Sequence, residues 1–147
     1  MRCPPLALLL AFSSCTGPAH AETLAGTIRV IDGDTLWHYP PGRRRDPEKI
    51  RLRGIDAPES TRSSCEAELV AGLRAKARLM ELIARPPVEI VRCDVTGGEC
   101  EDRFGRTLAD IRTPAGDVGE ALMREGLALP YVAGRKADRN AHWCGAR

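Results

Sequence analysis

The length and composition of the chain limit it to one ordinary globular domain. Its 147 residues and 16.0 kDa exclude a two-domain architecture, and 43% hydrophobic with 29% charged residues exclude wholesale disorder and a coiled coil. The formal net charge is +2, and removal of residues 1–21 takes away Arg2 and no acid, which leaves 21 basic and 20 acidic side chains. This balance excludes a protein that holds polyanions by bulk charge, as a histone-like binder does.

The N-terminus has the pattern of an export signal. Arg2 supplies positive charge, residues 6–12 form an apolar run, and Ala19-His20-Ala21 is a small-x-small cleavage site. We therefore expect a signal peptide over 1–21 and a mature domain over 22–147, in the periplasm or outside the cell. Lipidation at Cys15 is the alternative, but Phe12 fits that motif badly. No segment is long enough to predict a membrane span, and we expect a monomer.

Four cysteines remain after the signal: Cys65, Cys93, Cys100 and Cys144. An even number in an exported chain predicts disulfides, and four cysteines allow three pairings. Gly97-Gly98 can turn the chain between Cys93 and Cys100, so we favour this pair, with Cys65 bonded to Cys144. A zinc site is disfavoured because there is no Cys-x-x-Cys and the histidines are scattered.

Strand patterns dominate the first third of the mature chain. Residues 23–39 predict two strands joined by the acidic turn Asp32-Gly33-Asp34. The turn-rich run 40–47 is interpreted as a solvated hairpin tip rather than a nucleic-acid-binding finger. Residues 50–55 alternate apolar and basic side chains, which predicts a strand with Arg51 and Arg53 on one face.

A long helix should follow, over about residues 64–84. Ser63 and Glu66 form the pattern of a capping box, and Pro86-Pro87 ends the helical segment. The apolar residues behind the cap recur at helical spacing: Leu69, Val70, Leu73, Ala77, Met80 and Ile83.

The remaining segments predict two more strands and two short helices. The strands are 88–91 and 108–111, Asp117 and Glu120 open a helix that Gly126 closes, and 135–147 forms the last helix. About five strands with two or three helices predict a small barrel or a mixed sheet, and the pattern alone does not choose between them.

Two acidic turns carry the residues that suggest chemistry. Asp32 and Asp34 lie in the first turn, and Asp56 and Glu59 follow the strand that contains Arg51. A single aspartate in a turn usually caps backbone N–H groups, but four carboxylates at strand ends are also suitable oxygen ligands for a hard cation. A cation beside arginines such as Arg51 and Arg106 would suit phosphoryl chemistry, although spacing does not bring Arg106 to the turns.

Three segments in order carry a family resemblance. They are Val30-Ile31-Asp32-Gly33-Asp34-Thr35, then Ile50-Arg51-Leu52-Arg53-Gly54-Ile55-Asp56-Ala57-Pro58-Glu59, then Phe104-Gly105-Arg106 leading to residues 118–128. Together they make the chain similar to the staphylococcal (micrococcal, thermonuclease) nuclease-like family from about Thr27 to Tyr131.

The resemblance implies an α+β fold with a five-stranded OB-fold-type β-barrel and two to three helices. It further implies a Ca²⁺-dependent endonuclease that hydrolyses DNA and RNA and leaves 3′-phosphate ends. The implied metal-site residues are Asp34, Asp56, the Ala57 carbonyl and the neighbouring Thr35. Glu59 corresponds to the carboxylate that activates or orients the attacking water, and Arg51 and Arg106 correspond to phosphate clamps.

The resemblance also assigns nucleotide contacts to Phe104 and Tyr131. Phe104 stands in place of a tyrosine, and the ring keeps its capacity to stack on a base. Core packing is the alternative for both rings. Ala57 stands in place of a threonine, which matters little if the ligand is the carbonyl. The competing functions are a non-catalytic OB-barrel nucleic-acid-binding module, which would have no use for Glu59, and a disulfide-stabilised structural domain.

Overall fold

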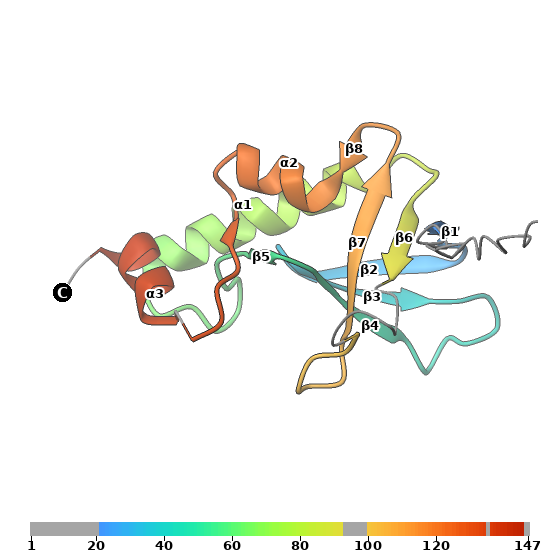
Figure 1. Ribbon diagram of the computed structural model, residues 1–147, viewed down its shortest axis with the longest axis horizontal. Coiled ribbons are helices and arrows are strands. Elements are labelled where there is room, and N and C mark those ends of the chain that lie inside the picture. Colours follow the sequence, from blue (N-terminus) through green and yellow to red (C-terminus); the bar gives the residue numbers. More distant parts are fainter. Residues whose placement is uncertain (1–20, 93–99, 135, 146–147) are drawn as a thin grey trace, which may run out of the picture.

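The computed structural model describes residues 21–92, 100–134 and 136–145, and these form a mixed sheet with three helices (Figure 1). In chain order the elements are β1 (Ala21–Thr23), β2 (Thr27–Asp32), β3 (Thr35–Tyr39), β4 (Glu48–Leu52), β5 (Ile55–Asp56), α1 (Glu66–Leu82), β6 (Glu89–Arg92), β7 (Thr107–Thr113), β8 (Gly116–Asp117), α2 (Val118–Arg124), β9 (Leu129–Pro130) and α3 (Lys136–Cys144). The predicted α+β class is confirmed. None of the helices in these described ranges is long and apolar enough to cross a membrane.

The main sheet is curved, and its two end strands, β1 and β2, follow each other directly in the chain. Its strand order is β1-β6-β7-β4-β3-β2, with β8 beside β7, and the β4–β7 pair is parallel. The end strands β1 and β2 are separated by residues 24–26 alone, and the Leu24 N–H still donates to the Val88 carbonyl at 2.8 Å. One N-terminal segment therefore pairs with β6 and then with β3, which gives the small, OB-like barrel shape expected from the resemblance.

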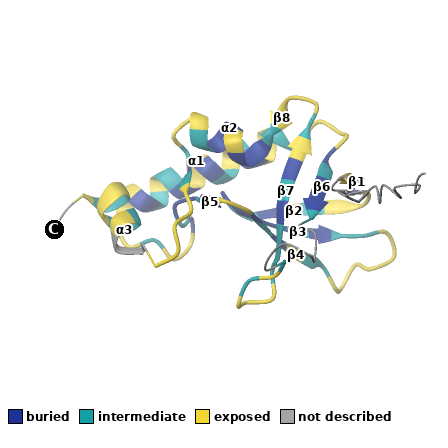
Figure 2. Ribbon diagram, viewed as in Figure 1, coloured by how far each residue is buried: buried dark blue, intermediate teal, exposed yellow. Residues whose placement is uncertain are grey.

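The inward residues of the strands and one face of each of the first two helices form the core. Leu36, Ile50, Ile90 and Ile111 are wholly buried on four different strands, and Leu122 of α2 joins them. Each such side chain contributes about 1.5–3 kcal/mol by leaving water. Figure 2 shows buried residues both on the strands of the sheet and on α1 and α2, and their packing in one cluster holds the sheet and the helices together.

Helix α1 begins slightly later than expected and with a different cap. The predicted capping box of Ser63 and Glu66 is wrong. The N-cap is Cys65, whose Sγ accepts from the Glu68 N–H at 3.4 Å, while the Glu68 carboxylate accepts from the Ser64 N–H at 2.5 Å. The cap is displaced because Glu68, and not Glu66, reaches back to the preceding backbone, and Cys65 is also joined by a disulfide to Cys144 at the end of α3.

The apolar residues that predicted α1 do not form most of its buried face, although Ile83 packs against the core. Val70, Leu73 and Met80 are 43%, 51% and 54% exposed. The residues that turn inward are Glu68, Gly72, Ala75 and Leu79. The physical reason is proximity: the helix packs directly on the backbone of residues 58–59, where small side chains fit and large ones do not.

The later predictions agree with the structure. Asp117 caps α2 by accepting from the Glu120 N–H at 2.9 Å, Gly126 follows the helix with φ +71°, and the tail forms α3. The predicted Cys65–Cys144 disulfide is confirmed. The predicted Cys93–Cys100 bridge includes Cys93, which lies outside the described residues. Residues 41–46 are exposed between β3 and β4, as expected for a solvated hairpin tip.

Candidate active site

The two acidic turns lie against each other. The Asp32 carboxylate accepts from the Ser60 N–H at 3.2 Å and from the Ser60 hydroxyl. The Asp34 carboxylate accepts from the Ala57 N–H at 3.1 Å. The predicted strand 50–55 is interrupted at Gly54, where φ is +76°, and this break turns the chain so that Asp56 and Ala57 reach the first turn.

Asp34 is the most buried carboxylate of this cluster. It is 5% exposed, and burial raises the pKa of its carboxyl group, outweighing the opposing effects of Arg51, the Thr35 hydroxyl and the Ala57 N–H. The Thr35 hydroxyl donates to Asp34 at 2.8 Å. A buried carboxylate whose charge is incompletely compensated is a favourable ligand for a cation.

Arg51 joins the two turns electrostatically. Its Nη1 lies 2.9 Å from Asp34 Oδ2, and its Nη2 lies 3.1 Å from Asp56 Oδ1 and 3.4 Å from the Ile55 carbonyl oxygen. The side chain is 15% exposed. The guanidinium is therefore oriented by two carboxylates beside the space where a phosphate could bind.

The structure brings Arg106 to the same place, which spacing did not predict. Its Nη1 donates to the Thr35 hydroxyl oxygen at 3.2 Å, while Nε and Nη2 lie 2.7 and 2.6 Å from Asp102 Oδ2. Burial alone would raise the pKa of Asp102, but hydrogen bonds from the Arg106 side chain and from the Arg106 and Phe104 N–H groups lower it. Asp102 is thus an ionised partner that orients Arg106.

Glu59 lies at the rim of the cluster and is partly accessible. Its side chain is 35% exposed, and burial together with the charges of Asp32 and Asp34 raises the pKa of its carboxyl group against the opposing charge of Arg139. Its backbone N–H points to the buried Glu68 carboxylate at 3.5 Å. A positioned carboxylate with a raised pKa is suited to accept a proton from water.

Arg139 is a member of the site that the sequence analysis missed. It extends from α3, is 13% exposed, and its Nη1 lies 3.3 Å from both Asp56 carboxylate oxygens and 3.7 Å from Glu59 Oε1. The only sequence signal is indirect, because the Cys65–Cys144 bridge requires α3 to return to the start of α1.

The two predicted nucleotide-contacting rings are exposed beside the arginines. Phe104 is 65% and Tyr131 is 54% exposed, so core packing is wrong for both. Arg51 Cζ lies 5.7 Å from the Tyr131 ring centroid and Arg106 Cζ lies 5.6 Å from that of Phe104. These rings are free to stack on bases while the neighbouring guanidinium groups bind phosphate.

The donor chemistry fits a hard divalent cation. Among the described residues no group of three or more His, Cys, Asp or Glu side chains is arranged to hold a metal ion. Asp34, Asp56, Thr35 and the Ala57 carbonyl nevertheless offer only oxygen donors, which suits Ca²⁺ with water and substrate oxygens as further ligands. The buried Asp34 carboxylate is the specific feature that such a cation would stabilise.

The sequence of the chain matches a known family and several known proteins. A family model described as staphylococcal nuclease homologue matches residues 49–143. Protein ParB of Escherichia coli is 32% identical over 142 residues, covering 90% of this chain and 71% of that protein.

Several relatives carry nuclease names, and two of them illustrate the extent of the match. Endonuclease YncB of Bacillus subtilis is 31% identical over 106 residues, 71% of this chain, and a probable staphylococcal-like nuclease of Oryza sativa subsp. japonica is 33% identical over 95 residues, 65% of this chain. The matched parts are 46% and 25% of those two proteins.

Proposed function

The chain belongs to the staphylococcal nuclease homologue family, and from that premise we propose that it is an exported, Ca²⁺-dependent endonuclease that hydrolyses phosphodiester bonds in DNA and RNA. The nuclease names of several relatives support hydrolysis of nucleic acid. The single observation that carries the proposal is one ionic network in which Asp34, Asp56 and Glu59 face Arg51 and Arg139, with Arg106 linked through Thr35.

Different residues of the site have different roles in the proposed phosphodiester hydrolysis. Asp34, Asp56, Thr35 and the Ala57 carbonyl would hold Ca²⁺, which when bound draws negative charge from the phosphate. Arg51 and Arg106 would bind the non-bridging oxygens, where charge builds as water attacks. Asp102 fixes the orientation of Arg106.

Glu59 is assigned to the attacking water. Its carboxylate would accept a proton as the water oxygen bonds to phosphorus, and the bond from phosphorus to the 5′ oxygen breaks on the opposite side. The departing 5′ oxygen takes up a proton, and the other product ends in a 3′-phosphate. The raised pKa of Glu59 supports this role because a stronger base accepts the proton more readily.

The site can contact parts of the substrate that DNA and RNA have in common. Phe104 and Tyr131 offer ring faces, and a ring stacks on any base. The arginines bind phosphate, which DNA and RNA share. We therefore propose cleavage of both polymers, with single-stranded regions preferred because their bases are free to stack.

Export is proposed from the N-terminal sequence and from cysteine chemistry. The signal pattern in residues 1–21 is followed by a chain in which Cys65 and Cys144 form a disulfide. Disulfides persist in the periplasm and outside the cell. We propose that the mature protein acts there as a monomer without a lipid anchor at Cys15.

The alternative is a binding module that keeps the barrel without cleaving. Binding requires the arginines and rings but gives no role to a water-facing carboxylate at Glu59. The experiment is cleavage of single-stranded DNA and RNA by the oxidised mature protein with Ca²⁺ or chelator, using Glu59→Gln and Glu59→Ala beside a matched Glu120→Gln control on α2.

We expect Ca²⁺-dependent cutting that falls by about 10²–10⁴-fold in both Glu59 variants and not in the control. The products should be substrates for a phosphatase specific for 3′ ends. A folded wild-type protein that binds DNA and never cuts it would establish the binding module instead.

A further inference from the structure

Trp37 lies on the outward face of β3 between two cations. Leu36 and His38, its chain neighbours, are 0% and 4% exposed and point into the barrel, whereas Trp37 is partly exposed. The strand register places Arg29 of β2 directly opposite Trp37 on one side and Lys49 of β4 opposite it on the other. Three adjacent strands thus present a cation, an indole ring and a cation in one row.

Both cations contact the indole ring. Arg29 Cζ lies 6.0 Å and Lys49 Nζ lies 5.8 Å from its centroid. Arg29 and Lys49 are themselves exposed, and among the described residues neither of them forms an ion pair or a side-chain hydrogen bond. Their charges therefore remain available to an anion, unlike Arg53 and Arg92, which have carboxylate partners.

This row adjoins the candidate active site on the same face of the sheet. Thr35 and Trp37 lie two residues apart on one face of β3, Lys49 and Arg51 lie two residues apart on one face of β4, and Thr35 is the direct partner of Arg51. Two residues along a strand span about 7 Å. The Trp37 row is therefore one step from the Thr35–Arg51 pair, a distance comparable with the spacing of consecutive nucleotides in an extended strand.

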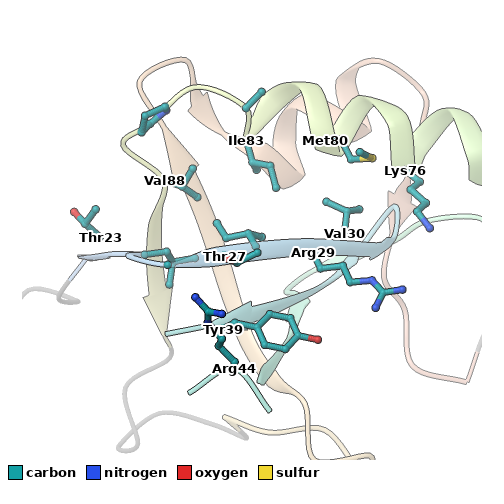
Figure 3. A pocket seen from close by; sticks show the side chains of 15 residues that line it. Thr23, Thr27, Arg29, Val30, Tyr39, Arg44, Lys76, Met80, Ile83 and Val88 are labelled. Carbon is teal, nitrogen blue, oxygen red and sulfur yellow. The ribbon is translucent and has the colours of Figure 1, made fainter. Parts of the chain in front are cut away.

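The surface continues beyond Trp37 with similar chemistry. Tyr39 is the next outward residue of β3, and Figure 3 shows Arg29, Tyr39 and Arg44 on the same side of β2, away from Val30 and Met80. Arg29, Tyr39 and Arg44 border a groove of about 1120 Å³ that extends around β2 to residues of α1. A strand leaving the active site along this face would meet cations and rings rather than acidic groups.

We propose that Trp37, Arg29 and Lys49 form a nucleotide-binding subsite, in which the indole stacks on a base of single-stranded nucleic acid and the two cations bind the adjoining phosphates. The inference rests on the proposed function for the position of the reacting phosphate. Stacking on one indole changes affinity by roughly tenfold, and it tolerates any base. The subsite would increase the affinity for single-stranded nucleic acid without making binding specific for its sequence.

The first test is a binding measurement in chelator, so that it does not depend on cleavage. A Trp143→Phe protein leaves Trp37 as its sole tryptophan. We expect oligothymidylate to quench its fluorescence, and an equally charged inorganic polyphosphate to leave the emission nearly unchanged. Equal quenching by polyphosphate, or no quenching by the oligonucleotide, would overturn the stacking assignment.

The second test uses variants and substrate length. Trp37→Ala should weaken binding of a twelve-nucleotide strand about tenfold, Trp37→Phe less than about threefold, and the exposed control Leu73→Ala on α1 not at all. In cleavage assays Trp37→Ala should raise KM for the long strand without lowering kcat, and the effect should vanish on a dinucleotide. Equal losses on both substrates would show a general structural defect and refute the subsite.

The two proposals fail in different ways. A wild-type protein that binds with Trp37 quenching and never cuts would remove the nuclease proposal and leave the subsite standing. A protein that cuts normally while Trp37→Ala binds like wild type would remove the subsite and leave the nuclease proposal intact.

Discussion

Arg139 Nη1 lies 3.3 Å from each carboxylate oxygen of Asp56, a residue 83 positions earlier in the chain. The same nitrogen lies 3.7 Å from Glu59 Oε1. The last helix therefore supplies a positive charge to the acidic cluster, next to the carboxylates proposed to hold Ca²⁺. A guanidinium and a divalent cation that share Asp56 repel each other, so Arg139 should weaken cation binding in the absence of nucleic acid.

We predict that Arg139→Gln binds Ca²⁺ more tightly, by about fivefold, which corresponds to roughly 1 kcal/mol for an ion pair largely shielded from water. Isothermal titration calorimetry of the nucleic-acid-free protein with Ca²⁺ would measure this change in affinity. The matched control is Arg53→Gln, because Arg53 also pairs with an aspartate, Asp110 at 2.5 Å, but lies outside the cluster. Weaker Ca²⁺ binding by Arg139→Gln would instead mean that Arg139 organises Asp56 for the cation.

The Cys65–Cys144 disulfide ties α3, the helix that carries Arg139, to the start of α1. It joins the N-cap of α1 to the final residue of α3, and α3 has only 9 residues, too few for a stable helix on its own. We predict that the Cys65→Ser, Cys144→Ser double variant loses about 4 kcal/mol of unfolding free energy, because the bridge closes a long loop. Urea denaturation would measure the loss.

The same double variant should also show the Ca²⁺ affinity of Arg139→Gln, because an undocked α3 removes the guanidinium from Asp56. Adding Arg139→Gln to the double variant should then change Ca²⁺ binding no further. If the two effects add, the helix stays docked without the disulfide and the bridge contributes to stability alone.

The unfolding free energy of the protein should depend on pH through the ionisation of Glu48. Its carboxylate accepts from Arg92 at 3.1 and 2.7 Å and from the Thr107 hydroxyl at 3.1 Å. Burial alone would raise the pKa of Glu48, but the hydrogen bonds and charge of Arg92 outweigh it and lower the pKa below its ordinary 4.5. A carboxyl group with a lowered folded-state pKa stabilises the protein above about pH 4.5, and this stability is lost as the pH falls through the folded-state value.

Unfolding free energies measured in urea between pH 6 and pH 3 should therefore fall less steeply for Glu48→Gln than for the wild type. The substitution lowers stability at pH 6, and its effect should shrink as the pH falls and the wild-type carboxyl group takes up a proton. Glu120→Gln on α2 serves as the control and should follow the wild-type slope. Parallel slopes for wild type and Glu48→Gln would show that other groups control the acid transition.

The sequence predicted those features that depend on local pattern. Alternation located β2, β3 and β4, the Asp117 cap located α2, and the spacing of cysteines around Gly97-Gly98 led to the Cys65–Cys144 pair. These succeed because a strand, a cap or a turn is determined mostly by neighbours in the chain.

The features that local pattern alone could not predict depend on contacts between distant segments. Arg106 reaches Thr35 across 71 positions, and no periodicity encodes that approach. Arg139 depends on how α3 docks. The apolar spacing predicted helix α1 but not its buried face, because the helix packs on the backbone of residues 58–59 and a small residue such as Gly72 carries no hydrophobic signal.

Gly72 is therefore the residue at which α1 approaches the backbone of the turn that carries Glu59 most closely. A Cβ at Gly72 would lie 2.5 Å from the Glu59 carbonyl oxygen, 2.6 Å from its carbon and 2.8 Å from the Pro58 carbonyl oxygen, all of them backbone atoms that cannot rotate away. In an ordinary helix interior, replacing glycine by alanine stabilises by about 1 kcal/mol. Here the clash should reverse the sign, and we predict that Gly72→Ala destabilises by about 2 kcal/mol.

The same displacement should move Glu59 away from its water. We predict that kcat of Gly72→Ala falls at least about tenfold at a temperature where the variant stays folded, since small misplacements of a catalytic group are costly. Ala77→Gly, at an exposed position of the same helix, is the control: it should lose about 1 kcal/mol of stability and keep its kcat. A Gly72→Ala variant that is more stable than wild type, or equally active, would show that α1 does not hold the Glu59 backbone as the structure indicates.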